Sequence, residues 1–146
     1  MKGSGIVKAV CTSETKGVQK RNVHKAFLKK EFGLEGDAHG GNWHRQVSLI
    51  SYDKVAEFNA SGAEVNHGDF GENLVVEGID FKALPVGTLL KGKDALLEIT
   101  QIGKECHTRC QIYHKMGDCI MPREGVFAKV LQEGYIEVGD MLEIIT

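Results

Sequence analysis

The chain has 146 residues, a hydrophobic fraction of 42%, a charged fraction of 26% and a net charge of −2. This length fits one domain over residues 1–146, with a core that needs neither disulfide nor metal to fold. The near-neutral charge gives no electrostatic argument for binding nucleic acid or an anionic membrane surface. Apolar runs fall far short of the roughly 20 residues of a membrane span, and the first residues do not resemble a secretory signal. With its four cysteines expected as free thiols, we predict a cytoplasmic protein.

Short apolar runs separated by glycines predict many short strands joined by tight turns. The expected strands cover Ile6–Cys11, Val23–Leu28, Val47–Ile50, Leu74–Val76, Leu89–Leu90, Ala95–Thr100 and Met141–Thr146. The residues Gly92, Lys93 and Asp94 predict a hairpin turn between the Leu89–Leu90 and Ala95–Thr100 strands.

Two helices are also expected. The first follows Ser51, a suitable N-cap, and has three residues on one face: Tyr52, Val55 and Phe58. The second opens near Pro122, ends at Gly134, and has an apolar stripe at helical spacing: Val126, Phe127, Val130 and Leu131. Because strands outnumber helices, we predict a mainly β protein, a β-barrel with a few peripheral helices.

The segment from Lys104 to Cys119 concentrates the residues best suited to chemistry. Thiolate is the reactive form of cysteine, and a nearby cation lowers the pKa that governs it. Arg109 adjoins Cys110, while Lys104 and His107 lie close in sequence to Cys106. A thiolate is also a good ligand for thiophilic metals such as molybdenum. The alternative is that these thiols are buried and inert.

A zinc site is a second alternative for the same segment. It offers four ligands of the types that structural zinc prefers: Cys106, Cys110, His114 and Cys119. The spacing differs from the usual pair of short spacings separated by a longer loop, and a domain of this size does not need zinc to fold.

A glycine-rich loop from Gly33 to Arg45 is the second candidate site. Glycines let backbone N–H groups approach an anionic ligand closely. His39, His44 and Arg45 add donors suited to phosphate or to a polar heterocycle. The alternative is a surface loop whose Asp and His side chains only satisfy turn backbone.

Two further stretches have structural explanations. The basic residues between Lys20 and Lys30 are interpreted as a solvated strand face. The segment Gly68–Leu74 is interpreted as a tight corner, across which Glu72 and Asn73 form hydrogen bonds.

These segments, taken in order, resemble the MOSC domain, which is named for the C-terminal part of molybdenum cofactor sulfurases. The resemblance covers GLEGDAHGGNWHRQVSL (Gly33–Leu49), GDFGENL (Gly68–Leu74), LLEITQIGKECHTRC (Leu96–Cys110) and VGD (Val138–Asp140). The stretch from Cys119 to Phe127 is similar to the small stand-alone bacterial branch of the family.

The resemblance implies a β-barrel with a cleft for the molybdenum cofactor (molybdopterin), and one cysteine that carries sulfur or ligates molybdenum. By position this cysteine is Cys110, with Cys106 as its rival. Cofactor-binding residues carried over in the same way are His39, His44, Arg45, Asn73 and Arg109. We expect the Gly33–Arg45 loop and the cysteine segment to face one shared cleft, and Cys110 to be more nucleophilic than Cys11.

Three functions stay open. The first is a module that binds the molybdenum cofactor, carries sulfur on a cysteine, or does both. The second is a molybdenum-cofactor-dependent oxidoreductase component that reduces N-hydroxylated small molecules, and the third is a zinc-stabilised, non-catalytic binding domain. Expected partners are molybdenum cofactor biosynthesis proteins or molybdoenzymes, with a cysteine desulfurase as sulfur donor. Full-length sulfurases also have a pyridoxal-phosphate domain, which this chain has no room for, so the resemblance leaves open whether the chain is an enzyme.

Overall fold

The computed structural model describes residues 3–16, 19–103 and 124–145. Within them the elements are, in chain order, β1 (Gly3–Thr12), β2 (Arg21–Asn22), β3 (Lys25–Lys29), β4 (Gly33–Leu34), β5 (Val47–Ser51), α1 (Tyr52–Ala60), β6 (Leu74–Glu77), the 3-10 helix η1 (Phe81–Ala83), β7 (Leu89–Lys91), β8 (Leu96–Ile102), β9 (Val126–Gln132), β10 (Gly134–Glu137) and β11 (Met141–Ile145).

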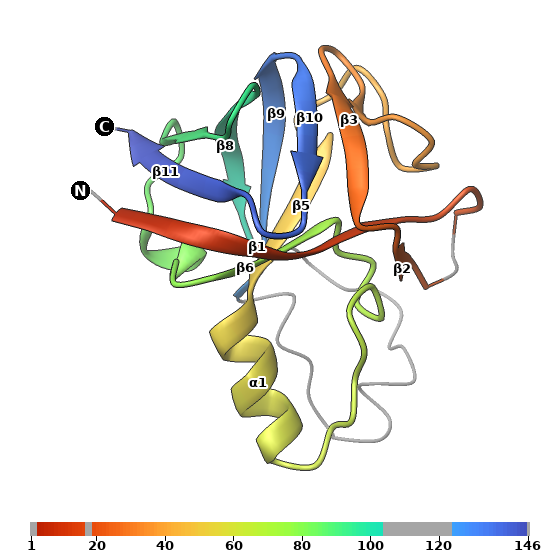
Figure 1. Ribbon diagram of the computed structural model, residues 1–146, viewed down its shortest axis with the longest axis vertical. Helices are drawn as coiled ribbons and strands as arrows, with labels where there is room; N and C mark the ends of the chain where they lie inside the picture. The colour runs from red at the N-terminus through yellow and green to blue at the C-terminus, as the bar shows by residue number, and fades with distance from the viewer. Residues whose placement is uncertain (1–2, 17–18, 104–123, 146) are drawn as a thin grey trace.

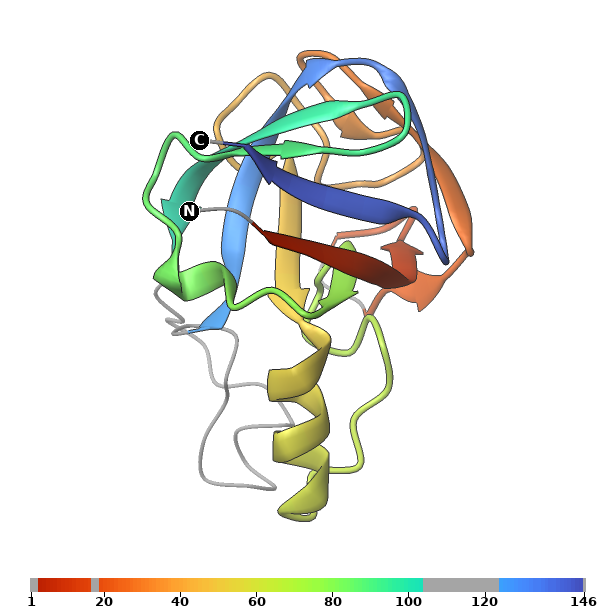
Figure 2. The same ribbon diagram turned by 60° about the vertical axis from the view of Figure 1, so that its left-hand side comes forward.

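The strands form a closed barrel, which Figures 1 and 2 show from two sides. Its strand order is β11-β7-β8-β9-β5-β6-β1, and β1 closes the ring by also pairing with β11. Neighbouring strands are antiparallel except for β5 and β6, which are parallel. β2 extends the sheet from β1, and β10, β3 and β4 form a separate small sheet. Closure pairs the strand edges, and the predicted β-barrel is confirmed.

Two apolar clusters hold this arrangement together. The larger cluster fills the barrel and includes Leu49, Leu97 and Ile99, each at most 1% exposed. The smaller cluster lies where α1 packs on the sheet through Val55 and Phe58. Burying side chains of this size stabilises the fold by roughly 1.5–3 kcal/mol each. Figure 1 shows α1 projecting from one end of the barrel, directly after β5.

Most of the predicted strands are confirmed, as is the hairpin between β7 and β8. The strand expected over Val23–Leu28 begins only at Lys25, because His24 has a φ of 69° that interrupts extended backbone between β2 and β3. The helix expected after Ser51 is α1, although the Ser51 side chain makes no capping hydrogen bond within the described helix.

The second expected helix is wrong over its apolar stripe, Val126–Leu131, which lies in the strand β9. β9 pairs with β5 on one side and with β8 on the other, so its backbone hydrogen bonds are made across the sheet. A strand buried on both faces is apolar at successive positions, and its sequence is hard to distinguish from a helical stripe. Gly134, expected to end the helix, begins β10, where a Cβ would lie 2.6 Å from the Asp94 Cβ. Pro122 lies outside the described residues.

Candidate functional site

A buried ion pair lies at the centre of the glycine-rich loop. The Lys20 Nζ is 2.7 and 2.9 Å from the two carboxylate oxygens of Asp37, and both side chains are at most 1% exposed. The sequence-based interpretation of a solvated basic face is wrong for Lys20, because its ammonium is buried and paired with Asp37. A buried charge needs a partner of opposite sign, and Asp37 provides it. Asp37 Oδ1 also accepts a hydrogen bond from the Ser13 N–H at 3.1 Å.

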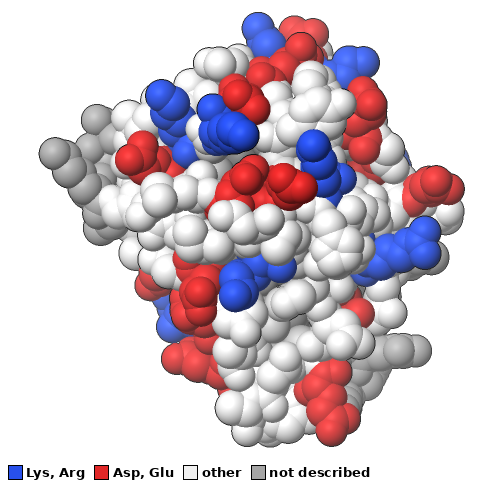
Figure 3. Space-filling model, viewed as in Figure 1, with Lys and Arg blue, Asp and Glu red and all other residues white. Residues whose placement is uncertain are grey.

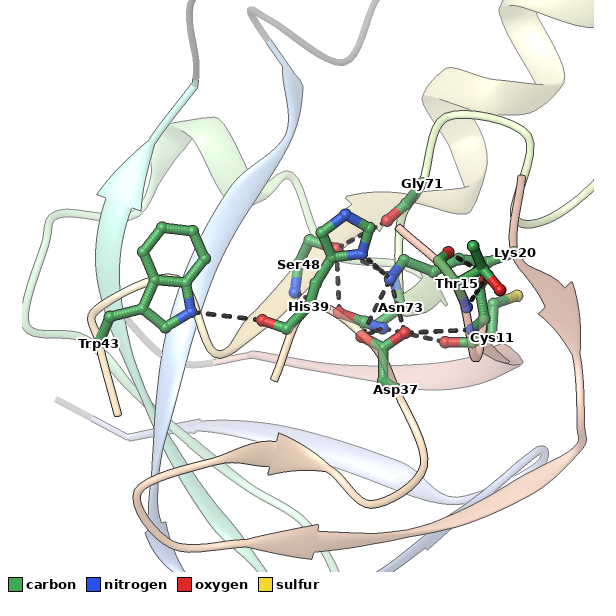
Figure 4. Close-up of polar contacts among 10 residues, drawn as sticks. Cys11, Thr15, Lys20, Asp37, His39, Trp43, Ser48, Gly71 and Asn73 are labelled. Atoms are coloured by element: carbon green, nitrogen blue, oxygen red, sulfur yellow. Dashed lines mark hydrogen bonds and ion pairs between the residues drawn. The ribbon is translucent and has the colours of Figure 1, made fainter. Parts of the chain in front are cut away.

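Asn73 connects this ion pair to two strands of the barrel (Figure 4). Its Nδ2 donates to Asp37 Oδ2 and to the Cys11 carbonyl oxygen, each at 3.0 Å. Its Oδ1 accepts from the Ser48 N–H at 2.9 Å and from the Ser48 hydroxyl at 3.1 Å. The amide thus joins β1, β5 and the loop, which makes Asn73 a residue that positions the loop on the barrel.

His39 lies at the edge of the same cluster, partly exposed. Its Nδ1 is 2.8 Å from the Lys20 Nζ, and its backbone oxygen accepts from the Trp43 Nε1 at 3.3 Å. The Trp43 side chain is exposed, with 45% of the residue accessible. Figure 4 shows the imidazole on the side of Asn73 and Lys20, and the Trp43 indole directed toward the His39 carbonyl oxygen.

His44 and Arg45 converge on one side chain, Gln101 at the end of β8. The Gln101 Oε1 accepts from the His44 Nε2 at 2.8 Å and from the Arg45 Nε at 3.0 Å. The amide cannot be reversed, because its Nε2 donates to the Gly103 carbonyl oxygen at 2.8 Å and Arg45 only donates. The Arg45 guanidinium also lies 5.0 Å from the centre of the Phe127 ring on β9. The loop is therefore attached to the strand that leads into the cysteine segment.

The corner between Gly68 and Asn73 packs against the backbone of Lys20, next to the buried ion pair. The Glu72 carboxylate is fully buried and accepts from the Gly68 and Phe70 N–H groups at 2.9 and 3.1 Å. Burial raises the Glu72 pKa to about 7, against the opposing effect of these hydrogen bonds. Gly68 has a φ of 95°, and a Cβ there would lie 2.0 Å from the Lys20 carbonyl oxygen. The predicted structural corner is present. The Glu72 side chain bonds to backbone N–H groups of the corner itself, whereas the Asn73 side chain bonds to residues outside it.

Cys11, the cysteine predicted to be less reactive than Cys110, lies in the buried strand environment expected for it. Cys11 is fully buried in β1, and burial raises the pKa of its thiol to about 12, with a further contribution from the Glu72 charge. A thiol with such a pKa is almost entirely protonated at neutral pH, so Cys11 is unsuited to nucleophilic chemistry.

The other cysteines lie outside the described residues, as does Arg109. The same holds for the alternative zinc ligands, Cys106, Cys110, His114 and Cys119. The described residues on either side of this segment lie next to each other, since the Gly103 N–H donates to the Gly125 carbonyl oxygen at 2.7 Å. Whether the loop and the thiols share a cleft stays a prediction. In the described part of the chain, no three His, Cys, Asp or Glu side chains are grouped as metal ligands would be.

Three residues of this site were not predicted: Lys20, Asp37 and Gln101. Asp37 stands in the glycine-rich loop, where a carboxylate between glycines is a weak signal for a buried partner. Lys20 and Gln101 carry no local signal, because their partners are 17 and 56 or more positions away in sequence.

Surface charge does not add to this picture. On the face in Figure 3, basic and acidic side chains are interspersed over the described residues rather than separated into areas of one sign. No helix within residues 3–16, 19–103 and 124–145 is long and apolar enough to cross a membrane.

Comparison with known proteins identifies relatives of this barrel. A family model described as the MOSC domain matches residues 35–143, which include His39, Arg45, Gln101 and Asn73. No curated protein matches the sequence.

Solved structures share the fold at low sequence identity. The YuaD protein from Bacillus subtilis has a TM-score of 0.81 at 18% identity, covering 99% of this chain and 97% of that one. YiiM from Escherichia coli has a TM-score of 0.70 at 19% identity, covering 98% and 70%. YiiM from Geobacillus stearothermophilus has a TM-score of 0.65 at 19% identity, covering 97% and 73%.

Proposed function

Because the chain belongs to the MOSC domain family, we propose that it is a molybdenum-cofactor-associated module that binds the cofactor, carries sulfur on a cysteine, or does both. One observation supports this proposal most directly. Arg45 and His44 both bond to Gln101, which lies three positions before the start of the cysteine segment at Lys104. Donors for an anionic ligand thus lie beside the end of β8, the strand after which the cysteine segment begins.

The donor chemistry of the loop fits the phosphate of a pterin cofactor. Arg45 has a planar guanidinium suited to phosphate, and its Nε bond to Gln101 fixes the plane of that group. His39 and His44 add ring nitrogens on the same loop. We propose that these three side chains bind and orient the cofactor, while Asn73 and Asp37 hold the loop on the barrel. When bound, the cofactor supplies a redox-active molybdenum with sulfur ligands.

The thiol role is proposed for Cys110, with Cys106 as the alternative. In the sulfur-carrier form, the cysteine thiolate attacks the outer sulfur of a persulfide on a donor protein, such as a cysteine desulfurase. A new S–S bond forms as the donor's S–S bond breaks, and the donor cysteine leaves as a thiolate. In the cofactor-holding form, the same thiolate is a ligand to molybdenum.

Metal and pterin analysis of protein purified from a cofactor-competent host tests this proposal. We expect molybdenum and pterin in comparable amounts, or a persulfide on one cysteine detected by mass spectrometry. The Arg45→Gln variant is expected to lose most of the pterin, while Arg21→Gln, a change at an exposed arginine of β2, retains it. Cys110→Ser and Cys106→Ser then show which thiol holds the sulfur or the metal.

The alternatives give different results in the same experiment. Zinc without molybdenum, pterin or persulfide would contradict the proposal and support a zinc-stabilised binding domain. Turnover of an N-hydroxylated compound by the loaded protein, with an added electron donor, would extend the proposal to an oxidoreductase component. The absence of pterin, molybdenum and persulfide from the wild-type protein would refute the proposal.

A further inference from the structure

We infer that the Trp43 indole binds the planar ring system of a pterin by stacking, next to the anion-binding guanidinium of Arg45. The inference rests on the proposed function for the identity of the ligand, a phosphorylated pterin. It adds a binding residue that a search for hydrogen-bond donors does not find, because the face of an indole has no hydrogen-bonding group.

Trp43 is an exposed aromatic side chain of the glycine-rich loop, with 45% of the residue accessible. Tyr135 on β10 is also exposed, but its ring packs against that of Phe27, with the two ring centres 5.1 Å apart. The groups beside the indole lie farther from its centre, the His44 ring at 5.9 Å and the Arg45 guanidinium at 6.0 Å. An accessible fraction close to one half corresponds to one open face of a flat ring. A large apolar face is thus in contact with water at the candidate site.

The loop holds this indole in one orientation. Its Nε1 donates to the His39 carbonyl oxygen at 3.3 Å, and the Trp43 backbone N–H donates to the Gly41 carbonyl oxygen at 2.9 Å. Figure 4 shows the indole with its Nε1 turned toward His39. A Cβ at Gly41 would lie 3.8 Å from the Trp43 Cδ1, so a larger side chain there would begin in contact with the ring. Glycine leaves this space open, and a ring that is already oriented loses less entropy when a ligand binds.

The Arg45 guanidinium supplies an anion-binding group beside the ring. It lies 5.0 Å from the centre of the Phe127 ring, and its Nε donates to Gln101 at 3.0 Å. Among the described residues, no acceptor bonds to its two terminal nitrogens, which carry four further N–H donors. Oriented donors next to an exposed aromatic face suit a molecule that joins an anionic group to a planar heterocycle.

The size of the expected effect follows from the stacking of nucleic-acid bases, which are planar nitrogen heterocycles like a pterin. Stacking of one base on an aromatic side chain contributes roughly five- to 150-fold to affinity, measured by replacing the aromatic residue with alanine. Loss of the aromatic ring at Trp43 is therefore expected to weaken pterin binding by about tenfold.

Two replacements of Trp43 separate the aromatic face from the rest of the side chain. Trp43→Phe and Trp43→Leu both lose the indole N–H, but only phenylalanine keeps an aromatic face. With protein loaded in a cofactor-competent host, we expect Trp43→Leu to retain about tenfold less pterin than Trp43→Phe. Tyr135→Leu, at the exposed tyrosine of β10, is the control and is expected to retain as much pterin as the wild type. Equal retention by the two Trp43 variants would overturn the inference.

A spectrum of the wild-type protein tests the contact itself. The chain has one tryptophan, so the NMR signals of tryptophan-labelled protein all belong to Trp43. We expect its carbon-bound ring protons to move upfield in pterin-loaded protein, because the ring current of a stacked heterocycle shields them. Protein from a host that does not make the pterin is the reference. A Trp43 that only positions Arg45 would not show this shift, and unchanged ring protons would overturn the inference even if a variant does not fold.

The same samples distinguish a failure of this inference from a failure of the proposed function. Bound pterin with unshifted Trp43 signals would overturn the stacking role and leave the proposed function standing. Wild-type protein without pterin would overturn both the stacking role and cofactor binding, whatever sulfur its cysteines carry.

Discussion

Replacing Asp37 by asparagine is expected to destabilise the protein strongly, because it leaves the Lys20 ammonium buried without a countercharge. Both side chains are at most 1% exposed. The new amide would also point N–H donors toward Lys20 or the Asn73 amide, which already donate to Asp37. Breaking a buried ion pair from one side costs about 3–5 kcal/mol. Domains have a total stability of roughly 5–15 kcal/mol, so this loss is a large fraction of it.

Urea denaturation of the purified variants measures this loss of free energy of unfolding. In thermal denaturation, the same loss corresponds to a fall in Tm of about 6–20 °C for a domain of this size. Lys20→Met combined with Asp37→Asn is expected to be more stable than Asp37→Asn alone, because it buries no unpaired charge. Glu98→Gln is the matched control, since the Lys129–Glu98 pair is 45% and 30% exposed and the loss of such a pair costs about 0–1 kcal/mol. An Asp37→Asn cost below about 1 kcal/mol would refute the reasoning, as would a double variant no more stable than the single one.

Three further predictions concern the corner and the thiols. Because the Glu72 pKa is raised from 4.5 to about 7, the folded state holds its proton more tightly than the unfolded state, and stability should fall as pH rises from about 4.5 to 7. Thermal denaturation across this range should show that slope in the wild type and lose most of it in Glu72→Gln; equal slopes would contradict the assignment. Cys110 should be alkylated far faster than Cys11, because burial raises the pKa of the Cys11 thiol from 9.0 to about 12. Mass spectrometry after timed iodoacetamide treatment compares the two rates. Gly68→Ala should destabilise much more than Gly71→Ala, since both have positive φ but only the first places a Cβ 2.0 Å from a backbone oxygen; similar urea midpoints would rule this out.

The sequence by itself determined the fold class and most of the elements. Apolar runs of strand length, separated by glycines, predicted β5, β6, the β7–β8 hairpin and β11, because each signal lies within a few consecutive residues. The helix α1 was found in the same way, from Val55 and Phe58 on one face. The strand β9 was missed because its apolar pattern also fits a helix, and its pairing with both β5 and β8 decides the outcome. Local secondary-structure propensity predicts an element poorly where hydrogen bonds to strands distant in sequence decide its conformation.

For the site, the sequence determined the residue types, and the tertiary structure decided how they are connected. His39, His44 and Arg45 were singled out by the chemistry of their side chains within one glycine-rich loop. That Lys20 is buried was decided by Asp37, 17 positions away, and by the corner at Gly68 that packs against the Lys20 backbone. That Arg45 lies at the end of β8 was decided by Gln101, 56 positions away. A lysine or glutamine has the same local sequence signal whether it is solvated or buried, because only the folded chain supplies the partner that offsets the loss of water.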